Sequence, residues 1–585
     1  MKTLHRTLHA HTIKGMFSLS ALVWISLVAS CVIGGCDDSL EFSTSLQEPS
    51  MVQGEPTPMD RDINKTDTSQ SHHPTSSALP SGLLIDPHFH TLFAPDEPTS
   101  TLELQLIERV IKARLADPER EGKYSIRYAI YNMTSELITD KLIEAERSGV
   151  DVQVLIESEQ LSQDKAWNLI NERFIEAGLS VEYDHRRLSD AERQSVDLIG
   201  IEDPGLMHLK LRIFETPTWS KVLTGSLNPN TTSYLNEETL HLITDEALIA
   251  QYHIAYQHLL YDRPQVNTWH EGSPLNVLFT PSDDGPRAVT QILKWIESED
   301  EQILIMMFAL RDITAPEIKE SLVELLARKV TEGVPVYVIT DQKQSDGVNS
   351  DGHQVFENDD TEDRLRAVGV HVYESLNAAT PYTAIHHKVA ILGLEKMRVI
   401  SGASNWSKSG LGSADQLARN VESVLFIDSD RLDQNYTGRR FLGQWFQVLR
   451  RYADDSIRQD HEPKVVDVFH DLSQDERWPQ QSLSFKVHAN VTREHEHVAI
   501  VGDLSELGIW GLAGHHQLVT SADQFPMWRS QEPLKVAIGQ SLTWKQVIID
   551  HEDTIMRWEQ GAHHVSSVKP PLMSHRELTL YGVWR

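Results

Sequence analysis

The segments AIHHKVAILG (residues 384–393), VISGASNWS (399–407) and ARNVES (418–423) hold the most informative group of polar residues in the chain. Their alternation predicts a strand with His386 and Lys388, a second strand ending in the turn Gly402–Asn405, and a third strand with Asn420 and Glu422. Side chains two residues apart on a strand share a face, so the imidazole and the ammonium group lie side by side. Such a pair, with an amide close by, suits the capture and attack of a phosphate.

A weaker copy of this pattern lies earlier, in MHLKLRIFE (207–215), LTGSLNPN (223–230) and YLNEETL (234–240). It supplies the same residue types in the same order, namely His208, Lys210, Gly225, Ser226, Asn228, Asn236 and Glu238. His208 and His386 are 178 residues apart, and so are Lys210 and Lys388. Equal spacing of chemically matched residues indicates a duplication.

Strands alternate with helical segments around both copies. From about Leu83, strands such as YSIRYAIYNM and VDVQVLIES alternate with helices such as LELQLIERVIKARLAD, which predicts an α/β layer structure. QILIMMFAL and EGVPVYVITD repeat the two strands later in the chain. Matched residues lie between 184 and 191 positions apart, as in the pairs Phe93 and Phe279, Gly149 and Gly333, Gly178 and Gly369. A repeat this long is a duplicated domain, and we expect its copies at 81–270 and 271–455.

Length, composition and charge limit the possible classes of protein. A chain of 585 residues exceeds one hydrophobic core and predicts three or four domains. Its 40% hydrophobic and 24% charged residues are typical of ordinary globular domains. The net charge of −32 disfavours a nucleic-acid partner, because such binding depends on neutralising phosphates with Lys and Arg. A small, locally positive pocket remains compatible with this charge.

The first 80 residues predict an export signal and a tether. A basic start and an apolar run end at Cys31 and Cys36, the only cysteines of the chain. We expect a signal peptide over 1–36 and a flexible linker, rich in Ser, Thr and Pro, over 37–80. The small residues before each cysteine resemble the lipobox of bacterial lipoproteins. This resemblance implies lipidation of Cys36, or else of Cys31, and a membrane-anchored protein of the bacterial cell envelope. An uncleaved N-terminal anchor is the alternative.

The C-terminal part differs in composition from the rest. A polar, charged link is expected over 456–482. The segments LSFKVHANV, HVAIVGD, LTWKQVIID and ELTLYGVWR then predict short alternating strands separated by turns. This pattern indicates an all-β sandwich over 483–585.

The duplicated part resembles the phospholipase D superfamily over roughly residues 83–450. The mark of that family is a His-x-Lys-x4-Asp motif that occurs twice, each copy followed by a Gly-Ser-x-Asn turn and an Asn-x-Glu segment. The resemblance implies two α/β/α sandwich domains related by pseudo-twofold symmetry, with one active site between them. It also implies a catalytic set of His208, Lys210, Asn228, Glu238, His386, Lys388, Asn405 and Glu422.

The residue types explain how such a site can work. One imidazole attacks phosphorus and forms a phosphohistidine, while the other protonates the departing alcohol and later activates water. Lysines and asparagines neutralise and bind the phosphoryl oxygens, and the glutamates fix the imidazole tautomers. Family analogy makes His208 the nucleophile and His386 the acid, although the symmetry permits the reverse. This chemistry requires no cofactor or metal, and none is expected.

The chain departs from the family pattern at three positions. Glu215 and Gly393 stand where the motif has Asp, and Ala403 stands where the first copy has Ser226. Ser404 is a possible substitute for the missing hydroxyl. These departures leave open a degenerate, inactive member of the family.

The predicted sandwich resembles the starch-binding module of carbohydrate-binding family twenty. VGDLSELGIW, LTWKQVII and RWEQG carry this resemblance, which implies an α-glucan site made of Trp510, Lys545 and Trp558. His563 replaces an asparagine of the family motif, and Phe525 is the nearest aromatic residue for a second site. We expect Trp528 and Trp584 in the core.

Together these resemblances imply a membrane-tethered phosphodiesterase that hydrolyses glycerophospholipids, or transfers their phosphatidyl group, and binds starch or glycogen. Two alternatives remain. One is a nuclease of the same superfamily, and the other is an inactive surface lipoprotein that binds α-glucans.

Overall fold

The computed structural model describes residues 88–95, 97, 99–117, 119, 124–161, 170–202, 205–230, 233–347, 359–375, 385–452, 480–512, 514–537, 541–568 and 577–585. The predicted signal peptide, the 37–80 linker and most of the 456–482 link lie outside these residues, as do Cys31 and Cys36. Among the residues described, no helix combines the length and the apolar character needed to cross a membrane.

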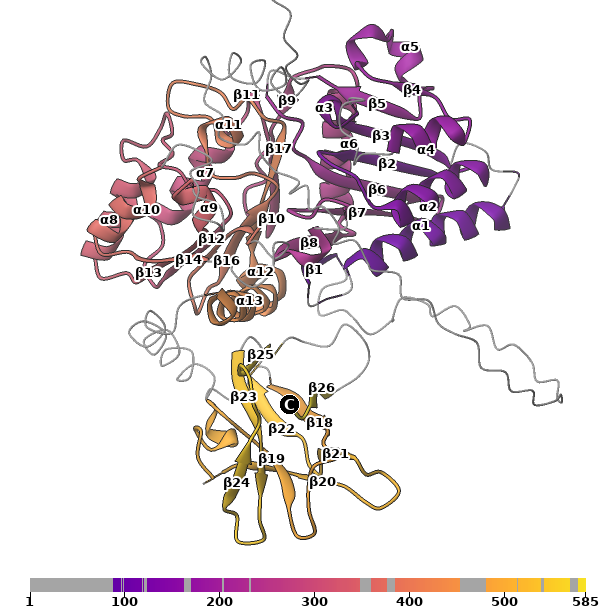
Figure 1. Ribbon diagram of the computed structural model, residues 1–585. Helices are drawn as coiled ribbons and strands as arrows, with labels where there is room; N and C mark the ends of the chain where they lie inside the picture. The colour runs from indigo at the N-terminus through magenta and orange to yellow at the C-terminus, as the bar shows by residue number, and fades with distance from the viewer. Residues whose placement is uncertain are drawn as a thin grey trace, which may run out of the picture. The chain divides into compact units, whose positions relative to one another are not determined.

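The first sheet has eight strands within the described residues, in the order β1-β8-β7-β6-β2-β3-β5-β4 (Figure 1). Its strands are β1 (Phe89–Ala94), β2 (Ser125–Ile130), β3 (Asp151–Glu157), β4 (Val181–Glu182), β5 (Leu198–Ile201), β6 (Lys210–Thr216), β7 (Trp219–Gly225) and β8 (Glu238–Ile243). Strands β2, β3, β5 and β4 pair in parallel, whereas pairing from β2 through β6, β7 and β8 to β1 is antiparallel.

The second sheet repeats this arrangement in the order β10-β17-β16-β15-β12-β13-β14. Its strands are β10 (Leu275–Thr280), β12 (Ile303–Met307), β13 (Val336–Asp341), β14 (His371–Ser375), β15 (Lys388–Leu392), β16 (Arg398–Gly402) and β17 (Glu422–Asp428). Even the register is repeated, since Phe93 pairs with Thr239 and Phe279 with Ser423. The predicted duplicated α/β fold is confirmed. A two-stranded parallel ladder joins β9 (Gln265–Val266) and β11 (Ser282–Asp284).

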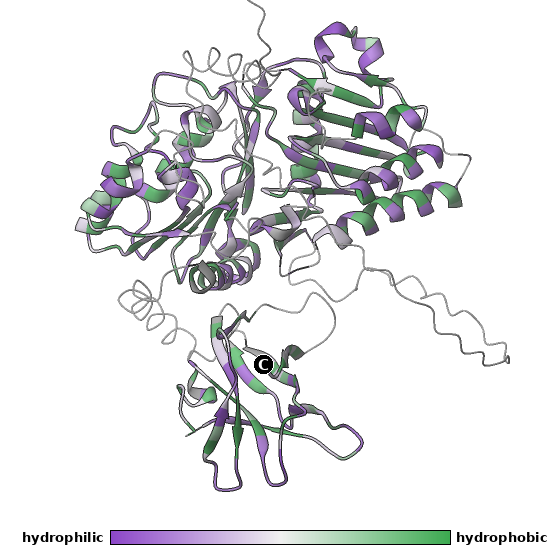
Figure 2. Ribbon diagram, viewed as in Figure 1, coloured by the Kyte–Doolittle hydropathy of each residue, from purple (hydrophilic) through white to green (hydrophobic). Residues whose placement is uncertain are grey.

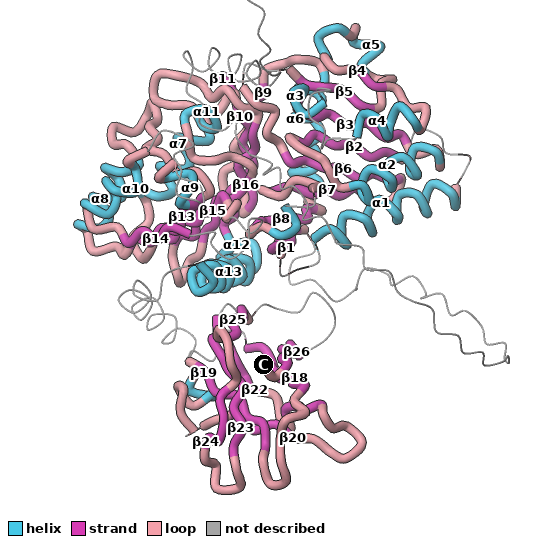
Figure 3. Tube along the Cα trace, viewed as in Figure 1, coloured by secondary structure: helices cyan, strands magenta, loops and turns pink. Residues whose placement is uncertain are grey.

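Helices cover both faces of each sheet (Figure 3). The helices of this part are α1 (Thr99–Ala116), α2 (Glu136–Arg147), α3 (Ser158–Leu161), α4 (Ile170–Glu176), α5 (Asp190–Arg193), α6 (Glu246–Leu260), α7 (Ala288–Glu297), α8 (Leu322–Thr331), α9 (Gln342–Ser345), α10 (Thr361–Ala367), α11 (Lys408–Leu411), α12 (Ser429–Asp433) and α13 (Tyr436–Tyr452). Short 3-10 turns are η1 (His185–Arg187) and η2 (Ser233–Leu235), and a third, η3 (Ser505–Leu507), belongs to the C-terminal sandwich.

Strand alternation divides the buried side chains into separate cores. In β6, Leu211 and Ile213 belong to a core that the two sheets share with α6 and α13, whereas Phe214 packs against α1 and α2. In β12, Leu304 enters the shared core and Ile305 packs toward α7 and α8. Figure 2 shows the hydrophobic stretches along the strands in green and polar stretches on the flanking helices in purple. The shared core holds the two halves together, because each sheet buries one face in it.

The two halves differ at one sheet edge. Strand β5 lies between β3 and β4, whereas β14 pairs directly with β13. Thirty residues separate Gly178 from His208, but only 17 separate Gly369 from His386. The first half therefore carries an insertion that forms η1, α5 and β5.

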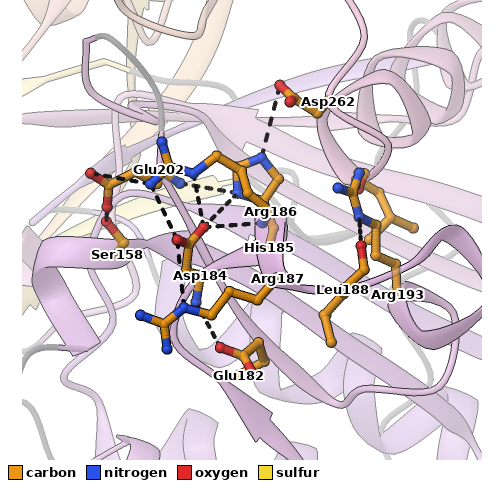
Figure 4. A network of polar contacts seen from close by, with 11 residues as sticks. Ser158, Glu182, Asp184, His185, Arg186, Arg187, Leu188, Arg193, Glu202 and Asp262 are labelled. Carbon is orange, nitrogen blue, oxygen red and sulfur yellow. Dashed lines mark hydrogen bonds and ion pairs between the residues drawn. The ribbon is translucent and has the colours of Figure 1, made fainter.

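A network of polar contacts fastens this insertion (Figure 4). Asp184 caps η1 and accepts a hydrogen bond from Nε of Arg186 at 3.0 Å. Nδ1 of the buried His185 accepts from the backbone N–H of Glu202 at 3.2 Å, just after β5. Arg193 donates to the carbonyl of Leu260 at 3.0 Å, which ties α5 to the end of α6. The contacts are structural, and they hold the added strand in place.

The C-terminal strands form the predicted sandwich. They are β18 (Gln480–His488), β19 (His497–Gly502), β20 (His516–Val519), β21 (Met527–Ser530), β22 (Leu534–Ala537), β23 (Ser541–Ile549), β24 (Ile555–Trp558), β25 (His564–Ser567) and β26 (Glu577–Val583). Pairing is antiparallel except between β18 and β26, which run parallel. Trp528 is buried in its core and Trp584 packs against that core, as predicted.

Candidate active site

The candidate site forms where two short segments of one half pair with two of the other. Met207 makes a parallel bridge with Val421, and Glu237 makes one with Ile385. The backbone N–H of His208 donates to the carbonyl of Val421 at 3.0 Å, and that of His386 donates to the carbonyl of Glu237 at 3.0 Å. Each predicted histidine thus lies beside the Asn-x-Glu segment of the opposite half.

The histidines and glutamates form crossed pairs. Nδ1 of His208 lies 2.9 Å from Oε2 of Glu422, and Nδ1 of His386 lies 2.8 Å from Oε1 of Glu238. An ionised carboxylate can only accept a hydrogen bond, so each Nδ1 is protonated and its N–H donates a hydrogen bond to the glutamate. The lone pair of each neutral ring is then on Nε2, the atom that attacks or exchanges protons in this chemistry. All four side chains are at most 5% exposed.

The two lysines have matching environments. Nζ of Lys210 donates to the carbonyl of His208 at 3.0 Å, and Nζ of Lys388 donates to that of His386 at 3.1 Å. Each ammonium group also lies over an aromatic ring, 5.4 Å from the centroid of Tyr131 and 5.0 Å from that of Phe308. Cation–π contact and a fixed carbonyl partner hold both charges in one geometry.

Sequence reasoning missed Tyr131 and Phe308. Their rings also contact the two histidines edge-on, at centroid distances of 5.1 and 4.8 Å. Each residue directly follows its strand, β2 or β12, and the two are 177 positions apart. This spacing, almost equal to that of the histidines, was the signal that could have identified them.

The two glycine turns that carry Asn228 and Asn405 are equally alike. Gly225 has φ +140° and Gly402 has φ +151°, and a Cβ on either would lie 2.2 Å from a carbonyl oxygen of the next strand. The backbone N–H of the following residue donates to that same carbonyl, of Thr239 in one half and Ser423 in the other, at 2.9 Å. Only glycine permits this close approach. Asn228 and Asn405 are 1% and 3% exposed.

The turns differ in their hydroxyl groups. Ser226 Oγ donates to Oε2 of Glu238 at 2.5 Å. At the equivalent place in the other half, Ala403 cannot donate, and Ser404 Oγ donates instead to the backbone carbonyl of Asn405 at 2.9 Å. Nδ2 of Asn420 donates to Oε1 of Glu422 at 3.3 Å. Glu422 therefore accepts a hydrogen bond from an amide, whereas Glu238 accepts one from a hydroxyl group.

The two positions that depart from the motif aspartate lie at strand ends. Glu215 is near the end of β6, where it accepts from Ser125 Oγ at 2.6 Å and contacts His253 at 2.9 Å. Gly393 follows β15 in a turn with φ +77°, and the carboxylate of Glu301 accepts hydrogen bonds from the next two backbone N–H groups. Glu215 thus stabilises the far end of β6, and the turn after Gly393 stabilises the far end of β15, the strands that begin at Lys210 and Lys388.

A buried ion pair supports the first half-site. Arg212 is fully buried, and its Nε donates to Oε1 of Glu103 at 3.1 Å. Another guanidinium N–H donates to the carbonyl of Leu227 at 2.8 Å, inside the turn that precedes Asn228. The equivalent position in the second half is Ala390, so this support belongs to one half alone.

The predicted glucan-site residues lie on two strands and a turn of the sandwich. Trp558 is 45% exposed at the end of β24, and Nζ of Lys545 on β23 donates to the carbonyl of the following Glu559 at 3.0 Å. Trp510 is half-buried, has φ +63°, and its ring centroid lies 4.5 Å from that of His563. Phe525 is 46% exposed. Trp558 thus presents the accessible aromatic face that sugar stacking needs.

Comparison with known families identifies both parts of the chain. The family model described as "Cardiolipin synthase, PLD-like domain" matches residues 120–260 and 292–445, together half of the chain. The model described as "Starch binding domain" matches residues 480–574. The chain therefore belongs to the phospholipase D-like family and carries a starch-binding domain of family twenty. No curated protein matches the chain.

Solved structures resemble the separate parts. Phosphatidylserine synthase from Haemophilus influenzae Rd KW20 is 15% identical with a TM-score of 0.44, over 67% of this chain and 95% of that one. Polyphosphate kinase from Porphyromonas gingivalis is 16% identical with a TM-score of 0.40, over 62% of this chain and 47% of the kinase, so the match spans under half the kinase. The family 20 module of a maltotetraose-forming amylase from Pseudomonas saccharophila STB07 is 22% identical with a TM-score of 0.15, over 18% and 99%.

Proposed function

We propose that this protein is a phosphodiesterase that hydrolyses glycerophospholipids, or transfers their phosphatidyl group to another alcohol, through a covalent phosphohistidine. The crossed His208–Glu422 and His386–Glu238 pairs carry this proposal. Each pair joins a histidine of one half to a glutamate of the other, and each half supplies an imidazole, an ammonium group and an amide in matched positions, which supports one shared site. The starch-binding domain adds attachment to an α-glucan.

In the proposed mechanism, Nε2 of His208 attacks phosphorus while protonated His386 gives its proton to the departing alcohol. The P–O bond breaks as the P–N bond forms. His386, now neutral, takes a proton from water, whose oxygen attacks phosphorus and releases His208 and a phosphate monoester. Lys210, Lys388, Asn228 and Asn405 stabilise the phosphoryl oxygens. Glu422 and Glu238 stabilise the positive charge that each imidazole carries in turn.

The negative chain and the predicted lipid anchor favour a phospholipid over a nucleic acid as substrate. The test is to incubate the detergent-purified chain with phosphatidylcholine and phosphatidylethanolamine vesicles, bis(p-nitrophenyl) phosphate and DNA. Release of choline or ethanolamine is expected, and it should be abolished in His208→Ala and in His386→Ala. His270→Ala, which changes a histidine outside the site, is the matched control. Unchanged release in either catalytic variant contradicts the site, and cleavage of DNA alone favours the nuclease.

An inactive glucan-binding protein is the second candidate, because Gly393 and Ala403 remove two polar groups of the family motif. Rapid quenching in an alkaline denaturant, in which the P–N bond survives, with a phosphorus-labelled diester distinguishes the two. Label recovered as phosphohistidine at His208 excludes the inactive protein, whereas absence of label and of turnover with every diester supports it.

Glucan binding is proposed for Trp510, Lys545 and Trp558. Indole rings stack on the apolar face of glucose, so Trp558→Ala should weaken retention on amylose roughly tenfold, and Trp510→Ala should weaken it as well. Tyr581→Ala, which changes another exposed aromatic residue of the sandwich, should bind normally. Unaltered retention in both tryptophan variants would place the glucan site elsewhere.

Anchoring in the bacterial cell envelope by a lipid on Cys36, or else Cys31, is proposed from the N-terminal sequence alone. Metabolic labelling with a palmitate analogue is expected to mark the wild-type chain. Loss of label in Cys36→Ser but not in Cys31→Ser would identify the residue, and an unlabelled wild-type chain would contradict the proposal.

A further inference from the structure

Three acidic side chains that are distant in the sequence meet beside the second sheet. Asp346 follows α9, Glu362 lies in α10 and Glu374 lies near the end of β14. One carboxylate oxygen from each lies within 4.8 Å of the other two. Because the three residues come from three separate elements, the sequence shows no metal-binding motif here, and none was predicted.

Glu362 is the unusual member of this cluster. It is 2% exposed, and among the described residues neither of its carboxylate oxygens receives a hydrogen bond from another residue. Burial, together with the nearby Glu374 carboxylate, raises the pKa of Glu362 to about 7. Buried carboxylates are normally hydrogen-bonded, paired with a cation or bound to a metal, because desolvation without compensation is costly.

The other two carboxylates have partners and so are fixed in place. Glu374 accepts from Ser345 Oγ and from Arg366, whose guanidinium nitrogen lies 2.6 Å from Oε2. Asp346 accepts from Nε2 of Gln342 at 3.0 Å. Arg366 also bonds Asp363 at 3.1 Å, so this arginine is directed toward Glu374 and Asp363. Two fixed carboxylates therefore face a third that receives no side-chain hydrogen bond within the described residues.

We propose that Asp346, Glu362 and Glu374 bind one Ca²⁺ ion. Calcium takes six to eight oxygen ligands at roughly 2.3–2.6 Å, so two ligands on opposite sides of the ion are about 4.6–5.2 Å apart. One carboxylate oxygen of each residue lies within 4.8 Å of the other two, close enough for all three to contact one such ion. Magnesium binds at roughly 2.0–2.1 Å in a stricter octahedron, which three carboxylates from separate elements supply less readily than the flexible shell of calcium. Water would complete the coordination.

This ion would stabilise the rim of the proposed active site without taking part in the chemistry. Glu374 and Asp341 lie at the carboxyl ends of neighbouring parallel strands, β14 and β13. Asp341 caps α9, and β13 pairs with β12, which is followed directly by Phe308, the residue whose ring contacts His386. An ion at Asp346 would therefore fix the far end of the helix that Asp341 caps.

The test is thermal unfolding and calorimetric titration of the full chain, first freed of metal with EDTA and then given CaCl2 or MgCl2. We expect millimolar Ca²⁺ to raise the unfolding temperature by roughly 2–4 °C and to bind with about one ion per chain, with a smaller effect of Mg²⁺. Glu362→Gln should remove the calcium response. In EDTA the same variant should unfold at the same temperature as wild type or higher, because it no longer buries a charge.

Asp363→Asn is the matched control, since it makes the same change at the next, exposed position of α10. It should keep the full calcium response, and Asp346→Asn provides a second variant of the site. No binding to wild type, an unchanged response in Glu362→Gln, or equal loss in Asp363→Asn would overturn the proposal. None of these measurements depends on phosphodiesterase activity, so a failure of the proposed function leaves the test intact.

Discussion

Each glutamate of the site contacts the histidine of the opposite half. Substituting one glutamate at a time should therefore affect the two histidines separately. Because Glu422 bonds the proposed nucleophile His208, Glu422→Gln should slow formation of the phosphohistidine. Glutamine can still accept from Nδ1, so it keeps the ring oriented but loses the charge that stabilises an imidazolium. We expect kcat to fall on the order of 10²-fold, within the range of general acid–base effects, and KM to change little.

Rapid-quench kinetics measures this prediction. The phosphohistidine should form more slowly in Glu422→Gln, whereas Glu238→Gln, which acts on His386, should also shift the pH profile of turnover. Equal effects of the two variants on every step would show that the two histidines share both roles. Wild-type kcat in Glu422→Gln would contradict the crossed arrangement.

The glycines of the two turns provide a second prediction at this scale. Gly225→Ala and Gly402→Ala each place a Cβ 2.2 Å from a backbone carbonyl oxygen, which cannot move without breaking a sheet. We expect each to lower the free energy of unfolding by about 3 kcal/mol or more. Gly178→Ala and Gly333→Ala are matched controls, because both glycines have positive φ but an added methyl group would meet no atom within 4 Å. Urea unfolding should show that the controls lose only about 1 kcal/mol.

Among the elements, α9 is a short helix whose N-terminal cap is a buried acid. Asp341 ends β13, and its Oδ1 accepts from the backbone N–H of Gln344 at 3.2 Å. Burial raises the pKa of Asp341 to about 6. The folded state therefore holds this proton more tightly than the unfolded state, whose carboxyl has a pKa near 3.8. The stabilising contribution of the Asp341 proton to the folded state is therefore complete below a pH of about 4 and is lost as the pH rises through about 6.

Asp341→Asn keeps a capping oxygen but removes the titration. Relative to this variant, wild type should lose about 3 kcal/mol of stability between about pH 4 and pH 7, since roughly two pKa units correspond to that amount. Urea unfolding of both proteins at the two pH values measures the difference. Parallel pH dependence of the two proteins would show that Asp341 is not the titrating group.

Most elements were predictable from the sequence, because strand alternation and helical spacing are local. The strands of both sheets, the duplication and the sandwich followed from such patterns. The insertion that forms β5 did not, because the strand between β3 and β4 has no counterpart in the second half, where β14 pairs directly with β13. Tyr131 and Phe308 were missed because an aromatic residue at the end of a buried strand has no distinctive local pattern. The crossed glutamates depend on interface geometry, which no local pattern encodes.

On the scale of the whole molecule, polar contacts across the two halves accompany the shared core. Thr239 Oγ1 lies 2.8 Å from Nδ1 of His387, which in turn is next to His386. Arg440 of α13 bonds Glu97 at 2.8 Å, close to β1 of the other half. These contacts are buried or nearly so, and breaking one leaves an unsatisfied group. The relative placement of the crossed pairs thus depends on an interface that is polar as well as apolar.

His241 makes this interface sensitive to acid. Its Nδ1 lies 3.0 Å from Oγ1 of Thr91, and its Nε2 lies 2.9 Å from Oγ of Ser401 in the other half. Complete burial lowers the pKa of His241 to about 3, from 6.5 in the unfolded chain. The unfolded state binds this proton at a higher pH than the folded state, so the contribution of His241 to stability is present above pH 6.5 and is lost as the pH falls toward about 3.

The loss attributable to His241 should approach about 5 kcal/mol, as roughly 3.5 pKa units correspond to that amount. His241→Gln should be less stable than wild type at pH 7, because it gives up a hydrogen bond across the interface, yet its stability should fall less on acidification. Urea unfolding at about pH 7, 5.5 and 4 measures both effects, with His270→Gln as a control outside the interface that should follow wild type. If wild type and His241→Gln lost stability in parallel over this range, the acid sensitivity would have to come from groups other than His241.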